Sequence, residues 1–164
     1  MKILIAEDEV MARNLLDFTL RKHSYETLLA VDGQEALDLL HTHSDIGLVI
    51  ADIIMPKLDG IELLTEMRAD LATRDIPVIV ATVMAEMDTV RIVSKLGCTR
   101  YLVKPVSPDD LLTAVREALG ESARVREALG QQEPVPVPTR QGDLPASRGY
   151  DLDDLLADEA GLAA

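Results

Sequence analysis

Acidic side chains stand at two places where a short apolar run stops. Glu7 and Asp8 follow the run Lys2–Ala6, and Asp52 follows the run Leu48–Ala51. Runs of this length are too short for helices and are typical of buried parallel strands, whose carboxyl ends gather functional groups at one edge of a sheet. Three carboxylates that meet at such an edge repel one another unless a hard divalent cation such as Mg²⁺ compensates their charge.

Two more polar side chains follow later apolar runs. Thr82 comes after Pro77–Ala81, and Lys104 comes after Arg100–Val103. An ammonium group and a hydroxyl beside a cluster of carboxylates and a cation form a site suited to phosphoryl transfer to a carboxylate. The cation and the Lys would neutralise charge on the transferred group, and a carboxylate would be the nucleophile.

Helical patterns alternate with these strands. Apolar spacing predicts helices over 10–22, 61–70 and 85–96, and capping residues predict two more that begin after Asp32 and Ser107. Glu35, three residues after Asp32, suggests a capping box. With a further strand over Glu26–Val31, the pattern is five β-α units, which predicts an α/β fold with a doubly wound parallel sheet in the order 2-1-3-4-5. In that order the first and third strands are neighbours.

The composition limits the possible partners. The chain has 164 residues, a formal net charge of −13, three tyrosines, one phenylalanine and no tryptophan. Such a chain is poorly suited to a nucleic acid or an anionic membrane. Cys98 is the single cysteine, so no internal disulfide is possible, and no run approaches the ~18 apolar residues of a membrane span. A cytoplasmic location fits these features.

Taken in order, these residues resemble a known family. The matching pieces are Glu7-Asp8, Asp52-Ile53-Ile54-Met55-Pro56, Asp59-Gly60, Thr82, and Tyr101-Leu102-Val103-Lys104-Pro105. Over about residues 1–119 the chain resembles the receiver domain of two-component response regulators, which has the CheY-like fold.

The resemblance implies a phosphorylation site at Asp52. Asp8, Asp52 and the backbone carbonyl of Ile54 would ligate Mg²⁺, Glu7 would bind it through water, and Lys104 would pair with the phosphoryl oxygens. The donor would be a sensor histidine kinase, a phosphotransfer protein or a small acyl phosphate. The chain would be a phosphoacceptor that assists its own phosphorylation and dephosphorylation, and not an enzyme.

The resemblance also implies a switch. Thr82 would hydrogen-bond to the phosphoryl group and move inward, and Tyr101 would turn into the space that Thr82 vacates. The face formed by the fourth helix, the fifth strand and the fifth helix would change. A downstream protein would bind there, and the sequence leaves open whether the domain also forms a homodimer.

Three residues depart from the family pattern. Val83 stands where Ala or Gly is usual and would narrow the entrance to the site. Ile54 and Met84 stand where many members carry polar side chains that position the hydrolytic water. The sequence therefore predicts a long-lived phosphoryl group.

The composition changes after residue 119. Residues 120–130, in which Val115–Gly120 recurs as Val125–Gly130, are interpreted as an extension of the last helix, and 131–149 as a Pro-rich linker. This leaves no room in the sequence for a DNA-binding output domain.

Residues 150–164 form an acidic tail with an apolar pattern. Leu152, Leu155 and Leu156 are spaced i, i+3 and i+4, as on one face of a short helix. The run resembles the acidic C-terminal helix by which a chemotaxis phosphatase docks on its receiver. Our hypothesis from the sequence is that the tail docks on the Tyr101 face of its own domain or a neighbour's. The alternative is a disordered, solubilising tail.

Two other function classes fit parts of the pattern. A phosphatase-type hydrolase could use Asp52 as nucleophile, but it would need a second carboxylate two residues on, where Ile54 stands. A flavodoxin-like flavin binder would need a phosphate-binding loop after the first strand, and Glu7-Asp8-Glu9 would repel a phosphate there.

Overall fold

The computed structural model describes residues 1–120 of the chain. The expected helix extension beyond Gly120, the Pro-rich linker and the acidic tail all lie outside the described residues.

Strands and helices alternate through the described part, as the sequence predicts. The elements are β1 (Lys2–Ala6), α1 (Val10–Lys22), β2 (Glu26–Ala30), α2 (Gly33–Thr42), β3 (Ile46–Ala51), α3 (Gly60–Ala69), β4 (Val78–Thr82), α4 (Met87–Lys95), β5 (Arg100–Val103) and α5 (Pro108–Ala118). The boundaries differ from the expected ones by one or two residues at most ends.

The five strands form one parallel sheet in the order β2-β1-β3-β4-β5, which confirms the predicted topology. Ala6 pairs with Ala51, the last residues of β1 and β3. The residues that follow them therefore leave the sheet side by side at its carboxyl edge.

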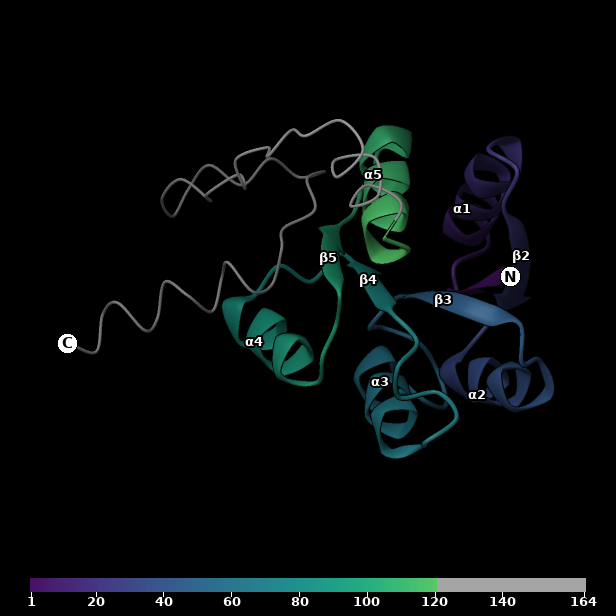
Figure 1. Ribbon diagram of the computed structural model, residues 1–164. Coiled ribbons are helices and arrows are strands. Elements are labelled where there is room, and N and C mark those ends of the chain that lie inside the picture. Colours follow the sequence, from purple (N-terminus) through teal and green to yellow (C-terminus); the bar gives the residue numbers. More distant parts are fainter. Residues whose placement is uncertain (121–164) are drawn as a thin grey trace, which may run out of the picture.

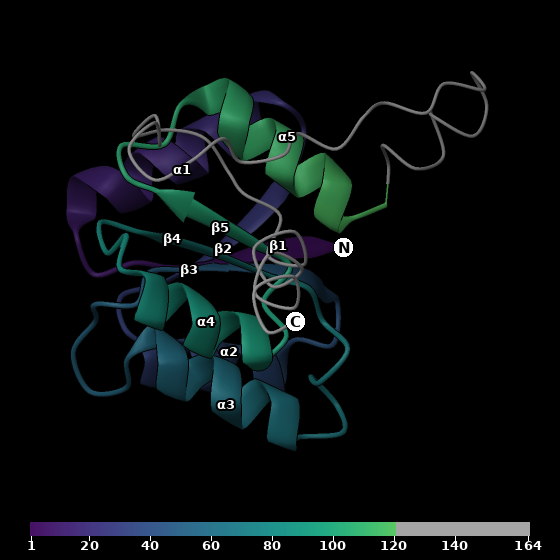
Figure 2. The same ribbon diagram turned by 90° about the vertical axis from the view of Figure 1, so that its left-hand side faces the viewer.

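The sheet lies between two layers of helices. Helices α1 and α5 cover one face, and α2, α3 and α4 cover the other (Figures 1 and 2). Each face of the sheet has its own hydrophobic core. Alternate residues of each strand belong to different cores, because successive side chains point to opposite faces. In β1, for example, Leu4 belongs to the core under α2 and α3, whereas Ile3 and Ile5 belong to the core under α1 and α5.

The expected capping box at the start of α2 is not formed. The Asp32 side chain accepts a hydrogen bond from the Glu35 N–H, but the Glu35 carboxylate accepts from the Val31 N–H, so the two residues do not form a capping box. The capping box lies on α3, between Asp59 and Glu62.

The apolar pattern of α1 is wider than its buried face. The apolar spacing that predicts this helix includes Leu15, Leu16 and Leu20; Leu16 and Leu20 are buried, but Leu15 is 56% exposed. Successive helical residues are turned by about 100°, so Leu15 points past the edge of the core.

This difference gives a matched test on one helix. We expect Leu20→Ala to lower the free energy of unfolding by about 2–5 kcal/mol, because Leu20 is fully buried and its loss leaves a cavity. Leu15→Ala should change it by less than about 1 kcal/mol. Urea unfolding of the full chain measures both. Equal losses would show that Leu15 is buried in solution.

Candidate functional site

The three predicted carboxylates meet at the carboxyl edge of the sheet. Glu7 and Asp8 follow β1, Asp52 follows β3, and one carboxylate oxygen of each lies within 4.8 Å of the others. Pairing of the two strands continues past their ends, since the Asp52 N–H donates to the Ala6 carbonyl at 3.0 Å. Glu7 and Asp52 are buried, whereas Asp8 is exposed.

Lys104 reaches this cluster from the end of β5. Its Nζ donates to Glu7 Oε2 at 2.5 Å and to Asp52 Oδ2 at 2.6 Å. Burial alone would lower the pKa of Lys104, but its hydrogen bonds to Asp52 and Glu7 outweigh burial and raise that pKa. Lys104 is therefore held as an ammonium ion between the two buried carboxylates.

Glu7 shows the opposite balance. Burial raises the pKa of its carboxyl and outweighs the lowering effect of the Lys104 hydrogen bond and charge, while the negative charge of Asp52 adds to the rise. One ammonium ion thus does not fully compensate the carboxylates that it faces. The site favours a second positive charge.

The donor set fits Mg²⁺. Three carboxylates converge, all donors are hard oxygen atoms, and the exposed Asp8 leaves the cluster open to solvent on one side. Asp8 and Asp52 are the residues that would hold such an ion, and Glu7 is the third, buried carboxylate of the cluster.

The loop after β3 is packed tightly against Asp52. The Ile54 N–H donates to Asp52 Oδ1 at 3.2 Å, and the Gly60 N–H donates to the Ile53 carbonyl at 2.9 Å. A Cβ on Gly60 would lie 2.2 Å from the Asp52 carbonyl oxygen. Glycine at position 60 therefore allows α3 to begin directly against the backbone of Asp52.

A second loop clamps the same segment, which the sequence did not predict. Gly33 donates its N–H to the Leu58 carbonyl at 3.1 Å, and a Cβ on Gly33 would lie 2.2 Å from that oxygen. The buried Asp32 also forms an ion pair with Lys57 at 3.1 Å, and Lys57 has a φ of 67°. The sequence predicts a capping role for Asp32, and this role does not indicate that Asp32 also pairs with Lys57 in the loop after β3.

Arg13 was also missed. Its Nη1 donates to the Glu7 carbonyl at 2.8 Å and to the Asp8 carbonyl at 3.4 Å, so α1 fixes the turn that carries both carboxylates. Arg13 lies one turn into α1, on the side that faces the site. Its partners are only five and six residues away in the sequence, but they are backbone carbonyl groups, which no residue type in the sequence marks.

The two expected switch residues lie on neighbouring strands, β4 and β5, where Thr82 pairs with Val103 and Tyr101 pairs with Val80. Thr82 is fully buried, and its hydroxyl accepts from the Met84 N–H at 3.3 Å. The Tyr101 ring is also buried, and its hydroxyl donates to the Met84 carbonyl. Burial raises the pKa of Tyr101. The inward position that the resemblance implies after phosphorylation is thus already occupied in this structure, because Met84 offers a partner there.

The chain belongs to the response regulator receiver domain family, whose pattern matches residues 3–116. The predicted family and fold are therefore confirmed. Among curated relatives, the transcriptional regulatory protein PdtaR of Mycobacterium tuberculosis is 37% identical over 131 residues, which cover 79% of this chain and 62% of PdtaR. The probable transcriptional regulator ycf27 of Galdieria sulphuraria is 41% identical over 116 residues, 70% of this chain and 44% of that protein. The chain spans about half the length of these relatives.

Solved structures agree with this assignment. The chemotaxis protein CheY4 of Vibrio cholerae superposes with a TM-score of 0.68 at 27% identity and covers 71% of this chain and 97% of its own. A receiver domain protein from Clostridium thermocellum gives 0.68 at 31% identity, with 76% and 98% covered. Within residues 1–120, no helix is long and apolar enough to span a bilayer.

Removing Lys104 should expose the repulsion in the cluster. We expect Lys104→Met to lower the free energy of unfolding by about 3 kcal/mol at pH 8 without divalent cations, since it leaves buried carboxylates uncompensated. The loss of Lys104 raises the pKa of Glu7 further above its unfolded value. Protonation then favours the folded state, so the deficit should shrink as the pH falls towards 5.

Urea unfolding in a chelator across this pH range measures the effect. Lys2→Met is the control, because the Lys2–Asp45 ion pair lies at the surface and should contribute less than about 1 kcal/mol. A deficit for Lys104→Met that does not change with pH would contradict the account.

Proposed function

We propose that this protein is a phosphorylation-dependent response regulator in which Asp52 accepts a phosphoryl group. The observation that carries the proposal is the position of Lys104, whose Nζ lies 2.6 Å from Asp52 within a cluster of three carboxylates. Glu7 and Asp52 each contact Lys104 and an N–H of the loop that follows their strand. We choose Asp52 as the acceptor because it stands at the position that the resemblance to receiver domains assigns to the phosphoacceptor.

In the proposed reaction, an Asp52 carboxylate oxygen attacks the phosphorus of the donor. The bond from phosphorus to the donor nitrogen or oxygen breaks, and its electron pair stays with the donor. The Lys104 ammonium group pairs with the negatively charged phosphoryl oxygens. The Thr82 hydroxyl turns away from the Met84 N–H and donates a hydrogen bond to one of these oxygens. Mg²⁺ held by Asp8, Asp52 and the Ile54 carbonyl would neutralise charge on the same oxygens, with Glu7 contacting it through water.

The proposed output is a change in protein contacts. Thr82 and Tyr101 both contact the backbone of Met84, so a shift of Thr82 towards a phosphoryl group would alter the segment that leads into α4. The face formed by α4, β5 and α5 would then bind a downstream protein or a second copy of the chain. A sensor histidine kinase or phosphotransfer protein would be the donor, in the cytoplasm.

The relatives named as transcriptional regulators do not change this proposal. The net charge of −13 disfavours direct contact with nucleic acid, so regulation through a protein partner fits this chain better. The residues of the site disfavour the two alternative functions, a phosphatase-type hydrolase and a flavodoxin-like flavin binder. Position 54 supplies no second carboxylate for a hydrolase, and the acidic turn after β1 opposes a flavin phosphate.

The phosphoacceptor can be tested directly. Incubation of the full chain with acetyl phosphate and Mg²⁺ should add one phosphate, detected by intact mass, and Asp52→Asn should abolish it. Asp38→Asn, on the exposed side of α2, is the control and should react like the parent. Phosphorylation of Asp52→Asn at the parent rate, or in the presence of excess chelator, would overturn the assignment.

The lifetime of the phosphoryl group is a separate prediction. Ile54 is 52% exposed beside Asp52, and neither its side chain nor that of Met84 can orient an attacking water by a hydrogen bond. We expect Ile54→Asn with Met84→Glu to speed the decay of the phosphorylated protein by up to about 10²-fold. Loss of phosphate is followed by intact mass after removal of the donor. Unchanged or slower decay in the double variant would show that these positions do not control the lifetime.

A further inference from the structure

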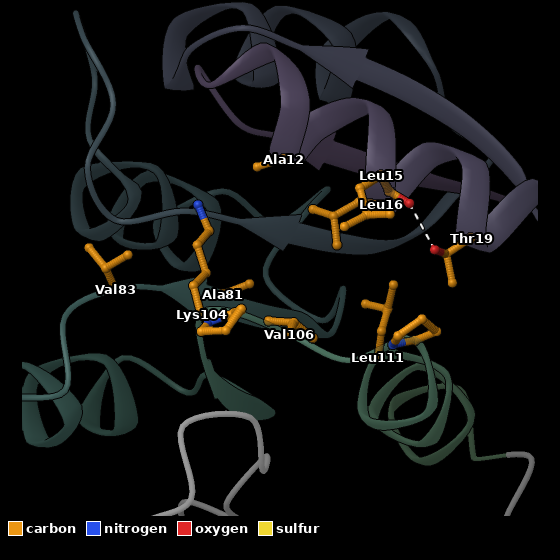
Figure 3. A pocket seen from close by; sticks show the side chains of 11 residues that line it. Ala12, Leu15, Leu16, Thr19, Ala81, Val83, Lys104, Val106 and Leu111 are labelled. Carbon is orange, nitrogen blue, oxygen red and sulfur yellow. Dashed lines mark hydrogen bonds between the residues drawn. The ribbon is translucent and has the colours of Figure 1, made fainter.

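An open groove lies on the face of the sheet covered by α1 and α5. Its volume is about 320 Å³, and it runs between the two helices over the end of β4 (Figure 3). The walls are mainly apolar, with Ala12, Leu15 and Leu16 from α1 opposite Leu111 from α5. The stem of Lys104 closes the end nearest the carboxylate cluster. The groove is therefore an apolar surface next to the site and not part of the site.

Exposed apolar side chains continue from the groove along α1. Met11, Leu15 and Phe18 lie at i, i+4 and i+7 on this helix; Leu15 lines the groove, and Met11 and Phe18 do not line it but extend the apolar stripe, with Phe18 67% exposed. Val83 is also exposed, and it lines the end near Lys104. Contiguous exposed apolar side chains of this kind mark interaction sites more often than ordinary surface. A helix with a matching apolar face would bury both the stripe and the groove.

The chain itself contains a segment with that pattern. Leu152, Leu155 and Leu156 share one face of any helix formed by residues 150–159, and every charged residue in this segment is acidic. Alone, such a segment is too short to be a stable helix in water, so it needs a surface on which to fold.

The charges at the two ends of the groove differ in sign. Asp109 and Asp110 lie at the end near the carboxylate cluster, in the first turn of α5. Lys22 and Arg116 lie at the other end, in the last turns of α1 and α5, where Glu117 is paired with Arg100 and Asp17 with Arg21. An acidic segment is repelled from the first end and attracted to the second, so the groove can accept it without bringing its carboxylates against Asp52.

The connection is long enough. Helix α5 has 11 residues, a length of about 16 Å, and the chain continues beyond Gly120 from the basic end of the groove. About thirty residues, 121–150, separate that point from the segment, and a flexible chain of this length has an average span of about 30 Å. A tethered segment of this kind has an effective concentration in the millimolar range.

We propose that residues 150–159 bind as a short helix in the α1–α5 groove of their own chain, with the three leucines on the apolar walls. The bound segment covers the α1 stripe beside Lys104. This proposal differs from the sequence-based hypothesis in its docking surface, because it uses the α1–α5 groove and not the Tyr101 face. It does not depend on phosphorylation of Asp52.

Paramagnetic relaxation tests the proposal in the full chain. A nitroxide is attached to Gly161→Cys, and the native Cys98 should not react, because it is buried and burial raises its pKa to about 12. We expect the amide signals of Leu15, Thr19 and Leu111 to lose most of their intensity, while that of Ile92 on α4 keeps it. The same label in a chain carrying Leu152→Ser, Leu155→Ser and Leu156→Ser should leave all four signals nearly unchanged.

Every other outcome contradicts the proposal. Loss of the Ile92 signal would place the segment on the Tyr101 face, and no loss at any of these amides would leave it undocked. Loss that persists when labelled, NMR-silent chains are mixed with unlabelled isotope-enriched chains would make it a contact between copies. Acetyl phosphate should phosphorylate the triple Leu→Ser variant and the parent equally, so failure of the phosphoacceptor assignment would be seen separately.

Discussion

The structure depends on a single ammonium group that faces an excess of negative charge. Lys104 donates to Glu7 and Asp52 at 2.5 and 2.6 Å, and both carboxylates are buried at the edge of the sheet. Burial raises the pKa of Glu7 by more than the Lys104 hydrogen bond and charge lower it, and the negative charge of Asp52 adds to the rise. The remaining charge makes the site receptive to a divalent cation and, through it, to an anionic phosphoryl group.

Much of the surrounding structure keeps these charges in place. The pairing of β1 with β3 brings the acidic strand ends together, and Arg13 holds the turn after β1 by its carbonyl groups. The loop after β3 is held from two sides, by Gly60 against Asp52 and by Gly33 against Leu58. Because neither glycine has room for a Cβ, the backbone around the Asp52 carboxylate has little freedom to relax away from the repulsion.

The order of the strands and the meeting of Glu7, Asp8 and Asp52 could be predicted, because both follow from apolar runs that end in polar residues. The exposure of Leu15 could not be predicted, since it depends on how α1 is rotated where it packs against β1 and β2. The Asp32–Lys57 ion pair and the inward Tyr101 also escaped prediction. Asp32 and Lys57 lie on two loops, and Tyr101 of β5 contacts the loop residue Met84. In both cases the partner is distant in sequence, and no local pattern specifies it.

A crystal structure of the full chain with Mg²⁺ and beryllofluoride would test the central claim most directly. The account predicts beryllofluoride on a carboxylate oxygen of Asp52, with one fluorine atom within hydrogen-bond distance of Lys104 Nζ. It predicts Mg²⁺ bound by Asp8, Asp52 and the Ile54 carbonyl, and Glu7 separated from the ion by water. Beryllofluoride on another carboxylate, or a metal ion that does not contact Asp8 and Asp52, would contradict it.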